Sequence, residues 1–378
     1  MRVVDGPQGT TVLLEGNPVL VLCSNNYLGL ADHPRLARAA ADAALALGTS
    51  SGASRLISGS MSIHTELEGR LAAFKRKEAA VLFGSGYLAN TGTIAALTGR
   101  GDVVFSDELN HASIIDGCRL SRAESFVYRH RDIEHLEWAL RRAAGRAALI
   151  VTDGVFSMDG DVAPLPELAI LARRNRCRLM VDEAHATGCM GPDGRGSVAA
   201  VGLTGEVDVI MGTLGKALGG YGAYVCGSRE LIDYLVNTAR PFIFSTALPP
   251  SVVAAADAAL DLLEESPERV TRLKANAACL RQSLRDAGVE PAGFGTQIVP
   301  LVIGEADATV ALSERLLERG VFAQAIRPPT VPAGTCRLRL TVMATHPETD
   351  LRRAATIIGE TVRELGIAPP VPELARAA

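Results

Sequence analysis

Seven short apolar runs between residues 79 and 227 constrain the fold of this chain more than any other feature. Each run ends in a turn, and segments long enough for helices lie between most of them. The runs cover residues 80–83, 103–105, 126–128, 148–152, 179–181, 207–211 and 223–226. Because short β-rich runs that alternate with helices are typical of a parallel sheet covered on both faces, we expect an α/β fold with a mostly parallel, seven-stranded sheet.

The residues before and after this region have a different pattern. Residues 11–23 predict a hairpin that turns at Gly16 and Asn17, and helices are expected from Pro34 to Gly48 and from Ser62 to about Lys77. After residue 250 the pattern predicts a long helical region to 287 that is broken near 266–267. Strands at 297–303, 321–325 and 337–341 and helices at 306–319 and 346–365 are then expected.

These changes of pattern predict four parts of the chain. They are an N-terminal hairpin segment (1–30), a large domain (31–250), a smaller C-terminal α+β domain (251–368) and a tail (369–378). A chain of 378 residues, 48% of them hydrophobic, can bury a large core and is too long for one ordinary domain, so we expect two domains or one large domain with a smaller appendage.

Composition excludes several classes of protein. The formal net charge is -4 and no long run of one sign occurs, so we expect no nucleic-acid partner. The seven cysteines are scattered without the CxxC spacing of a zinc site, which indicates buried thiols in a reducing compartment and no metal. Residues 1–6 do not resemble a signal peptide, and no apolar stretch reaches the ~18 residues that span a bilayer. We therefore expect a cytoplasmic protein with no membrane partner.

Lys216 is the residue most informative about function. The chain has only four lysines, and three of them (Lys75, Lys77 and Lys274) lie in polar, helix-like segments where we expect solvated surface side chains. Lys216 instead follows the apolar run 207–211 and lies among glycines that allow close approach. A lysine in such a place can form an imine with a carbonyl, which is the chemistry of a pyridoxal-phosphate enzyme. A purely structural lysine in a Gly-rich loop is the alternative.

Other polar groups also follow apolar runs, at the edge where a parallel sheet places its ligands. Asp182 suits a charge-assisted hydrogen bond to a pyridinium nitrogen, with His185 three residues on, although a turn cap is the alternative. The turn at Ser85, Gly86 and Tyr87 opens a helix whose N–H groups can bind a phosphate. The remaining candidates are a ring-stacking histidine and two hydroxyls, namely His111, Ser157 and Thr213. A solvent-facing histidine and a polar turn are the alternatives for His111 and Ser157.

Taken together, these residues belong to a set of motifs that resembles the α-oxoamine synthases, which are fold-type-I pyridoxal-phosphate enzymes. The motifs are SNNYLGL (24–30), SGASRLISG (51–59), NHAS (110–113), GVFSMDGD (154–161), DEAH (182–185) and TLGK (213–216). The resemblance extends from about residue 5 to 365. It implies pyridoxal 5'-phosphate as the cofactor and a transferase with a large cofactor-binding domain and a smaller C-terminal domain.

The resemblance also implies roles for single residues. Lys216 would be the imine lysine and the base, Asp182 would pair with the ring nitrogen and His185 with the ring oxygen. His111 would stack on the ring, so these four residues form the expected catalytic group. The expected phosphate and support contacts are Ser85, Gly86, Tyr87, Ser157, Thr213 and Thr246. Thr246 would reach the site from a second subunit, which predicts a homodimer with shared active sites.

The substrate residues are also expected from the resemblance. Arg339 would hold the carboxylate of the amino acid, a use that suits its forked guanidinium, with Asn25 nearby. Thr330 would touch the acyl substrate. Family members usually have a further N-terminal helix with a substrate-binding arginine near its end, and Arg2 is the only candidate for that role here.

The string IRPPTVP at 326–332 resembles one branch of the family more than the others. That branch condenses L-alanine with a pimeloyl thioester of CoA or an acyl carrier protein, giving 8-amino-7-oxononanoate, carbon dioxide and free thiol in biotin synthesis. The glycines 219, 220 and 222 instead resemble the branch that uses glycine and acetyl-CoA. The alternative expectation is therefore a sister condensing enzyme with another amino acid and acyl chain.

Overall fold

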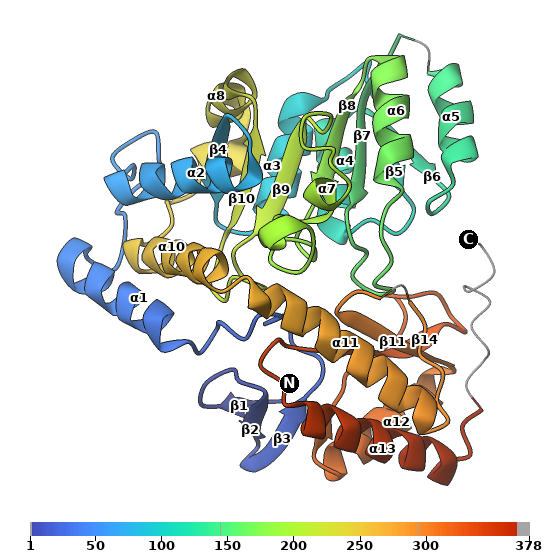
Figure 1. The fold of residues 1–378 in the computed structure, drawn as a ribbon. Coiled ribbons are helices and arrows are strands. Elements are labelled where there is room, and N and C mark those ends of the chain that lie inside the picture. The colour runs from blue at the N-terminus through green and yellow to red at the C-terminus, as the bar shows by residue number, and fades with distance from the viewer. Residues whose placement is uncertain (1, 144, 294, 369–378) are drawn as a thin grey trace. The chain divides into compact units, whose positions relative to one another are not determined.

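The computed structural model describes residues 2–143, 145–293 and 295–368 (Figure 1). The predicted tail, 369–378, lies outside the described residues. Two compact units divide the described chain: a larger one of residues 33–156 and 162–265, and a smaller one of residues 2–32, 157–161 and 266–368. The compact units change after residues 32 and 265. The domain boundaries expected after residues 30 and 250 stay predictions.

The larger unit contains one seven-stranded sheet in the order β4-β10-β9-β8-β7-β5-β6. Its strands are β4 (Ala79–Phe83), β5 (Val103–Asp107), β6 (Glu124–Tyr128), β7 (Ala147–Asp153), β8 (Arg178–Asp182), β9 (Val209–Thr213) and β10 (Ala223–Gly227). Neighbouring strands are parallel except β10, which is antiparallel to β4 and β9. The expected α/β fold is confirmed, and each predicted apolar run lies in or overlaps one strand.

Helices cover both faces of this sheet (Figure 1). The helices of the larger unit are α1 (Pro34–Leu47), α2 (Ser62–Lys75), α3 (Gly86–Leu97), α4 (Ala112–Ser121), α5 (Ile133–Arg142), α6 (Leu165–Asn175), α7 (Ser197–Ala200), α8 (Arg229–Thr238), α9 (Arg240–Ile243) and α10 (Pro250–Glu265), and α1 packs on α10. Alternate strand residues such as Val81 and Met180 pack in one core with Ile94 of α3 and Ile114 of α4. Helices α2 and α6 also pack on the sheet. Because successive side chains point to opposite faces and both faces are covered, the inner strands are apolar at most positions, whereas the edge strand β6 is largely exposed.

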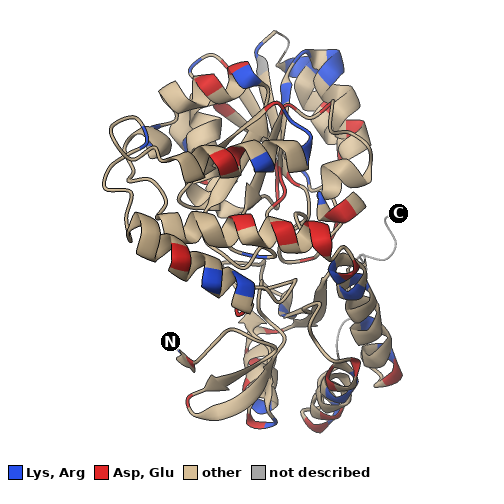
Figure 2. Ribbon diagram, turned by 60° about the vertical axis from the view of Figure 1, so that its left-hand side comes forward, with Lys and Arg blue, Asp and Glu red and all other residues tan. Residues whose placement is uncertain are grey.

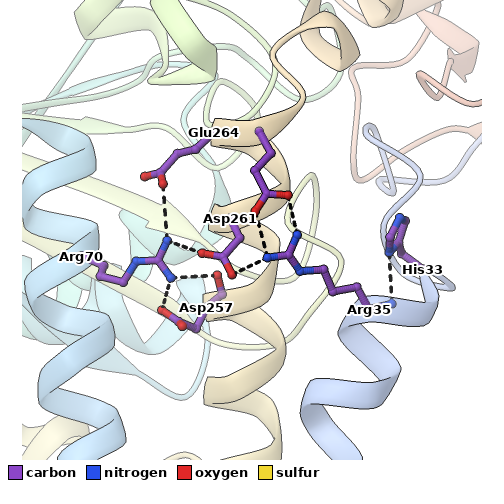
Figure 3. A network of polar contacts seen from close by, with 7 residues as sticks. His33, Arg35, Arg70, Asp257, Asp261 and Glu264 are labelled. Carbon is purple, nitrogen blue, oxygen red and sulfur yellow. Dashed lines mark hydrogen bonds and ion pairs between the residues drawn. The ribbon is translucent and has the colours of Figure 1, made fainter.

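An ion-pair network ties α1 and α2 to the acidic side of α10 (Figure 3). Arg35 of α1 and Arg70 of α2 both reach Asp261, at 2.8 and 2.7 Å. Arg35 also binds Glu265 at 2.5 Å, and Arg70 binds Asp257 at 2.7 Å. The forked guanidinium allows each arginine to hold two carboxylates at once, so two helices far apart in sequence from α10 are fastened to it.

The smaller unit contains two sheets and three helices. The first sheet has the order β1-β2-β3-β12 and the second has the order β11-β14-β13. The elements are β1 (Val4–Asp5), β2 (Thr11–Leu14), β3 (Asn17–Val21), α11 (Glu268–Asp286), β11 (Ile298–Gly304), α12 (Ala306–Glu318), β12 (Val321–Phe322), β13 (Ala325–Ile326), β14 (Cys336–Thr341) and α13 (Glu348–Glu364). These elements agree with the expected α+β pattern, including the break between α10 and α11, except that the single strand expected at 321–325 is two short strands, β12 and β13, in different sheets.

The predicted position of the hairpin turn is wrong by one residue. Asn17 is already paired with Leu14, so the two-residue loop consists of Glu15 and Gly16. Both loop residues have positive φ, 52° and 83°. A two-residue loop with this backbone matches the twist of the flanking strands, and glycine at its second position lowers the cost.

The charged side chains of both units lie mainly on the helices, and in the view of Figure 2 these helices carry both signs. Within the described part of the chain, no helix is both long enough and apolar enough to cross a membrane. The seven cysteines are all free thiols, five of them buried.

The expectation of three solvated lysines is wrong for two of them. Lys75 is 3% exposed, and its Nζ donates to Glu183 Oε2 at 2.6 Å. Lys77 is half-buried and donates to the carbonyl of Val207 at 2.5 Å, and burial lowers the pKa of its amine. Lys274 is exposed as expected. The partners of Lys75 and Lys77 are more than a hundred residues away in sequence, which local composition does not reveal.

Candidate active site

The register of the sheet brings the carboxyl ends of β4, β7, β8 and β9 to one edge. Phe83 and Thr213, the last residues of β4 and β9, are both partners of Ala223, the first residue of the antiparallel β10. Asp153 is the partner of Asp182 at the ends of β7 and β8. The turns after β4, β7, β8 and β9 therefore open on one edge of the sheet, where α/β proteins place their ligands.

Lys216 lies half-buried in the turn between β9 and β10, and its Nζ is 2.8 Å from His185 Nε2. Thr213 shapes this turn, because its hydroxyl donates to the carbonyl of Gly222 at 3.0 Å and accepts from the N–H of Gly215 at 3.1 Å. A hydrogen bond between two nitrogens requires one of them to accept. The amine and the imidazole therefore lie at a distance over which a proton can pass between them.

Asp182 ends β8 with its carboxylate buried, 3% exposed. One oxygen accepts from the backbone N–H of Ala184 at 2.8 Å, as a turn cap does, and the other accepts from Asn90 Nδ2 at 2.7 Å. Asn90 lies on α3 and was not selected from the sequence. Its only signal there is a place one turn into the helix that follows the Gly-rich turn.

His111 is the N-cap of α4, and its backbone N–H donates to Asp153 Oδ2 at 2.8 Å. Its Nδ1 accepts from the backbone N–H of Ser113 at 3.2 Å, which fixes the ring. Burial lowers the pKa of His111, and the charge of Asp182 opposes this shift. Burial also raises the pKa of Asp153 well above its usual range, and the charge of Asp182 adds to that effect. Asp153 is a second residue of this edge that sequence analysis missed.

The Gly-rich turn after β4 has the form of an anion-binding helix start. Ser85 is the N-cap of α3 and accepts from the N–H of Leu88 at 3.3 Å, and the helix begins at Gly86. The first N–H groups of a helix have no partner within it and lie at the positive end of its dipole. Tyr87 is 46% exposed, and its hydroxyl donates to Asp116 Oδ2 at 2.5 Å, so its side chain is held at the surface.

Thr246 forms no hydrogen bond with the described residues at this edge of the sheet. It forms an isolated antiparallel bridge with Ser54, and its neighbour Ala247 donates to the carbonyl of Ala53 at 3.0 Å. Thr246 is exposed, and Phe244 is 69% exposed. The segment is thus held against the Ser/Gly-rich loop 49–60 and presents side chains to the outside of the unit.

In the smaller unit, Arg339 of β14 is buried, 7% exposed, among neutral acceptors. It donates to Asn25 Oδ1 at 3.3 Å, to the hydroxyl of Tyr27 at 3.1 Å and to the carbonyl of Ser157. No carboxylate of the described residues forms an ion pair with it. Because a buried cation without an anionic partner is unfavourable, this guanidinium is suited to receive a carboxylate from outside the chain. Tyr27 was not selected from the sequence.

Two predicted substrate residues are not brought to this group. Thr330 is exposed in the loop between β13 and β14, where its N–H donates to the carbonyl of Arg327 at 3.1 Å. Arg2 is exposed before β1. Neither side chain forms a hydrogen bond or ion pair with another described residue. Their roles stay predictions.

The groups at the sheet edge fit the predicted pyridoxal phosphate. Lys216 supplies a primary amine, Asp182 a buried carboxylate, and the start of α3 a set of N–H groups. The buried Asn90 Oδ1 has no hydrogen-bond partner in the part of the chain that the structure describes. An acceptor beside Asp182 is thereby left for a donor group of a ligand.

Comparison with known proteins agrees with this assignment. Residues 17–358 match the family model described as aminotransferase class I and II. The chain is 58% identical to an 8-amino-7-oxononanoate synthase of Geobacter sulfurreducens over 372 residues, 97% of this chain and 95% of the relative. It is 56% identical to a protein of that name from Citrifermentans bemidjiense over 370 residues, again 97% and 95% of the two chains.

Solved structures with the same fold include two named enzymes. The serine palmitoyltransferase of Sphingomonas wittichii has a TM-score of 0.94 and 33% identity, and the match covers 97% of this chain and 93% of that one. The 8-amino-7-oxononanoate synthase of Francisella tularensis has a TM-score of 0.79 and 27% identity, covering 92% and 99%. A high-resolution structure of SPT with PLP as an internal aldimine has a TM-score of 0.94 and 33% identity, covering 97% and 94%.

Proposed function

Because the chain belongs to the class I and II aminotransferase family, and within it to the α-oxoamine synthases, we propose that it condenses L-alanine with a pimeloyl thioester. The products are 8-amino-7-oxononanoate, carbon dioxide and the free thiol. The observation that carries this choice of substrates is the 58% identity, over nearly the full length of both chains, to a relative named for that product.

The proposed cofactor is pyridoxal 5'-phosphate. When bound, it supplies an aldehyde for the amine of the substrate and a ring that accepts electrons when a bond at Cα breaks. Lys216 holds it through Nζ, Asp182 accepts from its ring nitrogen and His185 binds its phenolic oxygen. His111 packs on the ring, and the start of α3 at Ser85, Gly86 and Tyr87 binds the phosphate. Thr213 and Ser157 support these contacts.

The residues of the chain then act on the amino acid as binding groups and as a base. Arg339 binds the carboxylate of alanine, with Asn25 and the hydroxyl of Tyr27 fixing the guanidinium. Lys216 Nζ takes the Cα proton, for which its contact with His185 provides a route of proton exchange. Cα forms a bond to the thioester carbonyl carbon, and the thiolate leaves. The carboxylate then departs as carbon dioxide, and Lys216 returns a proton to Cα.

A homodimer is part of the proposal, with Thr246 of one copy reaching the phosphate of the other. Leu56, Ile57 and Phe244 are 48%, 80% and 69% exposed. They lie in the two segments that the Ser54–Thr246 bridge holds together. Apolar side chains exposed at neighbouring points are typical of a surface that a partner covers.

The free thiols support a reducing compartment, so the proposed location is the cytoplasm.

A second candidate is a sister enzyme that joins another amino acid to another acyl thioester. The observation in its favour is the higher TM-score to serine palmitoyltransferase, 0.94, than to the 8-amino-7-oxononanoate synthase of Francisella tularensis, 0.79. Thr330 is the proposed contact to the acyl substrate in either case, and Arg2 is a proposed substrate-binding residue.

The test is mass spectrometry of the product formed by the purified, cofactor-loaded protein. L-Alanine with pimeloyl-CoA or a pimeloyl carrier protein is compared with glycine and acetyl-CoA and with L-serine and palmitoyl-CoA. We expect 8-amino-7-oxononanoate from alanine and pimeloyl thioester, and none from the Lys216→Ala variant. A larger kcat/KM for either of the other pairs would assign the chain to a sister activity.

A further inference from the structure

A buried ion pair includes the residue that follows Asp182 in the DEAH motif, between the two predicted cofactor ligands Asp182 and His185. Lys75 at the end of α2 and Glu183 after β8 are 2.6 Å apart, and their side chains are 1% and 0% exposed. Glu183 follows Asp182 and precedes His185 by two residues. Nothing in the proposed reaction uses either charge.

Every polar atom of this pair has a partner. Lys75 Nζ donates to Glu183 Oε2, to Thr187 Oγ1 at 2.8 Å and to the carbonyl of Arg195 at 2.6 Å. Glu183 Oε1 accepts from the hydroxyl of Ser197 at 2.8 Å and from the N–H of Val198 at 2.7 Å. Even a well-bonded buried ion pair adds little stability compared with apolar side chains of the same size, because both charges must be desolvated. Stability alone is therefore a weak reason for this pair.

The pair fixes the backbone that carries Asp182 and His185. The N–H of Glu183 donates to the carbonyl of Met211 at 2.7 Å, and the carbonyl of Glu183 accepts from the N–H of Thr187 at 2.9 Å. Lys75 Nζ donates to the side chains of Glu183 and Thr187, which lie at the two ends of this turn. Because Glu183 directly follows Asp182, the last residue of β8, holding the Glu183 side chain restricts the orientation of Asp182.

The same network also reaches the turn that carries Lys216. Thr187 Oγ1 is 3.1 Å from the hydroxyl of Tyr224. That hydroxyl lies against Gly212, where an added Cβ would come within 2.3 Å of it. Gly212 precedes Thr213, the hydroxyl that shapes the Lys216 turn. Hydrogen bonds on the His185 side and the close packing of Tyr224 on Gly212 on the Lys216 side thus support the Lys216–His185 contact.

We propose that Lys75 and Glu183 are positioning residues, whose ion pair sets the orientation of Asp182 and His185 toward the cofactor and toward Lys216. This role rests on the proposed cofactor but not on the choice of substrates. The ion pair acts through the backbone of residues 182–187, and neither charged group touches the cofactor.

The test uses the dissociation constant of pyridoxal phosphate and the pH midpoint of its visible absorption band, without substrates. Lys75→Met, Glu183→Gln and the double variant are compared with the wild type. We expect each to weaken cofactor binding by about 10-fold to 100-fold, the range found when groups that orient a ligand are removed. The pH midpoint should shift as well. The double variant should regain stability, because no lone charge stays buried, but not the affinity or the midpoint.

Leu140→Ala is the matched control, because Leu140 of α5 is 1% exposed and its loss destabilises the unit without touching the network. It should leave the dissociation constant and the midpoint unchanged. Thr187→Val keeps both charges and replaces the charge variants if these do not fold. It should change the dissociation constant and the pH midpoint in the same direction but by less. Unchanged affinity and midpoint in folded variants would overturn the positioning role. So would a double variant that recovers both along with its stability. Absence of condensation activity in a wild type that binds the cofactor would reject only the proposed substrates.

Discussion

Asp153 and Asp182 are direct partners across the parallel strands β7 and β8, yet their carboxyl groups have different environments. Asp182 accepts from Asn90 and Ala184, whereas Asp153 accepts from the backbone of His111. Burial, together with the charge of Asp182, raises the pKa of Asp153 well above its usual range. Two adjacent buried carboxyls do not both ionise readily, so burial and the neighbouring Asp182 disfavour the ionised form of Asp153.

This difference between the two carboxyl groups predicts different outcomes for two similar substitutions. Because the pKa of Asp153 is raised, a neutral amide of the same shape suits its site, and Asp153→Asn should change kcat and cofactor affinity little. Asp182→Asn removes the carboxylate that would pair with the ring nitrogen, and kcat/KM should fall by roughly 10²- to 10³-fold, the scale of one lost electrostatic contact at a reacting centre. Steady-state kinetics and cofactor titration measure both. Equal losses in the two variants would contradict the assignment.

The free energy of unfolding of the wild type and of Asp153→Asn, measured at different pH, also tests the raised pKa of Asp153. Above the ordinary Asp pKa of 3.8, the unfolded chain loses the Asp153 proton while the native state keeps it. The contribution of this group to the free energy of unfolding therefore falls as pH rises through that range. Asp153→Asn should remove this part of the pH dependence, as measured by urea unfolding between pH 4 and 8.

Arg339 predicts a selective effect on amino-acid binding. Its hydrogen bonds go to neutral oxygens of Asn25, Tyr27 and Ser157, so the charge is available to a substrate carboxylate. Arg339→Lys loses the forked geometry, and KM for L-alanine should rise about 10-fold to 100-fold, as for a charged hydrogen bond. Tyr27→Phe should raise KM less, and the dissociation constant of the cofactor should be unchanged in both. A fall in cofactor affinity of the same size would assign Arg339 to a different role.

The strands and the edge of the sheet were predictable because their signals are local. Apolar runs bounded by turn residues mark strands, and polar residues directly after them mark the edge. Lys216, Asp182 and His111 were therefore found from their neighbours in sequence. The contact of Lys216 with His185 was not predicted, because a shared edge does not show which side chains of the two turns meet.

The residues that were missed depend on contacts distant in sequence. Lys75 ends an ordinary amphipathic helix, where lysine is usually solvated, and its partner Glu183 is 108 residues away. Asn90 is 92 residues from Asp182, and a polar residue inside a helix gives no sign of which carboxylate it meets. The hairpin turn was misplaced because Gly-Asn and Glu-Gly both suit a two-residue loop, and only the strand register decides between them.

The ion-pair network on α10 predicts a small, salt-dependent loss of stability. Asp261 holds both Arg35 and Arg70, and its side chain is 34% exposed (Figure 3). Partly exposed ion pairs contribute little each, so Asp261→Asn should lower the free energy of unfolding by about 1 kcal/mol at low salt. The loss should shrink in molar salt, because screening weakens the wild-type pairs. Glu348→Gln removes a fully exposed pair within α13 and is the control, with almost no effect expected. A loss independent of salt would indicate packing rather than charge.

His346 predicts a loss of stability in acid that a single substitution removes. The ring is 3% exposed, and its Nδ1 accepts from the N–H of Met343 at 2.8 Å. Burial lowers the pKa of His346 from 6.5 to about 4. Between these values the unfolded chain binds a proton that the native state does not, so stability present above pH 6.5 is lost as pH falls toward 4. The loss is about 3 kcal/mol for a shift of this size. His346→Asn keeps an acceptor for Met343 without a titrating ring. Urea unfolding at pH 7 and pH 4.5 should show a much smaller difference for this variant than for the wild type. Equal acid losses in the two proteins would place the titrating group elsewhere.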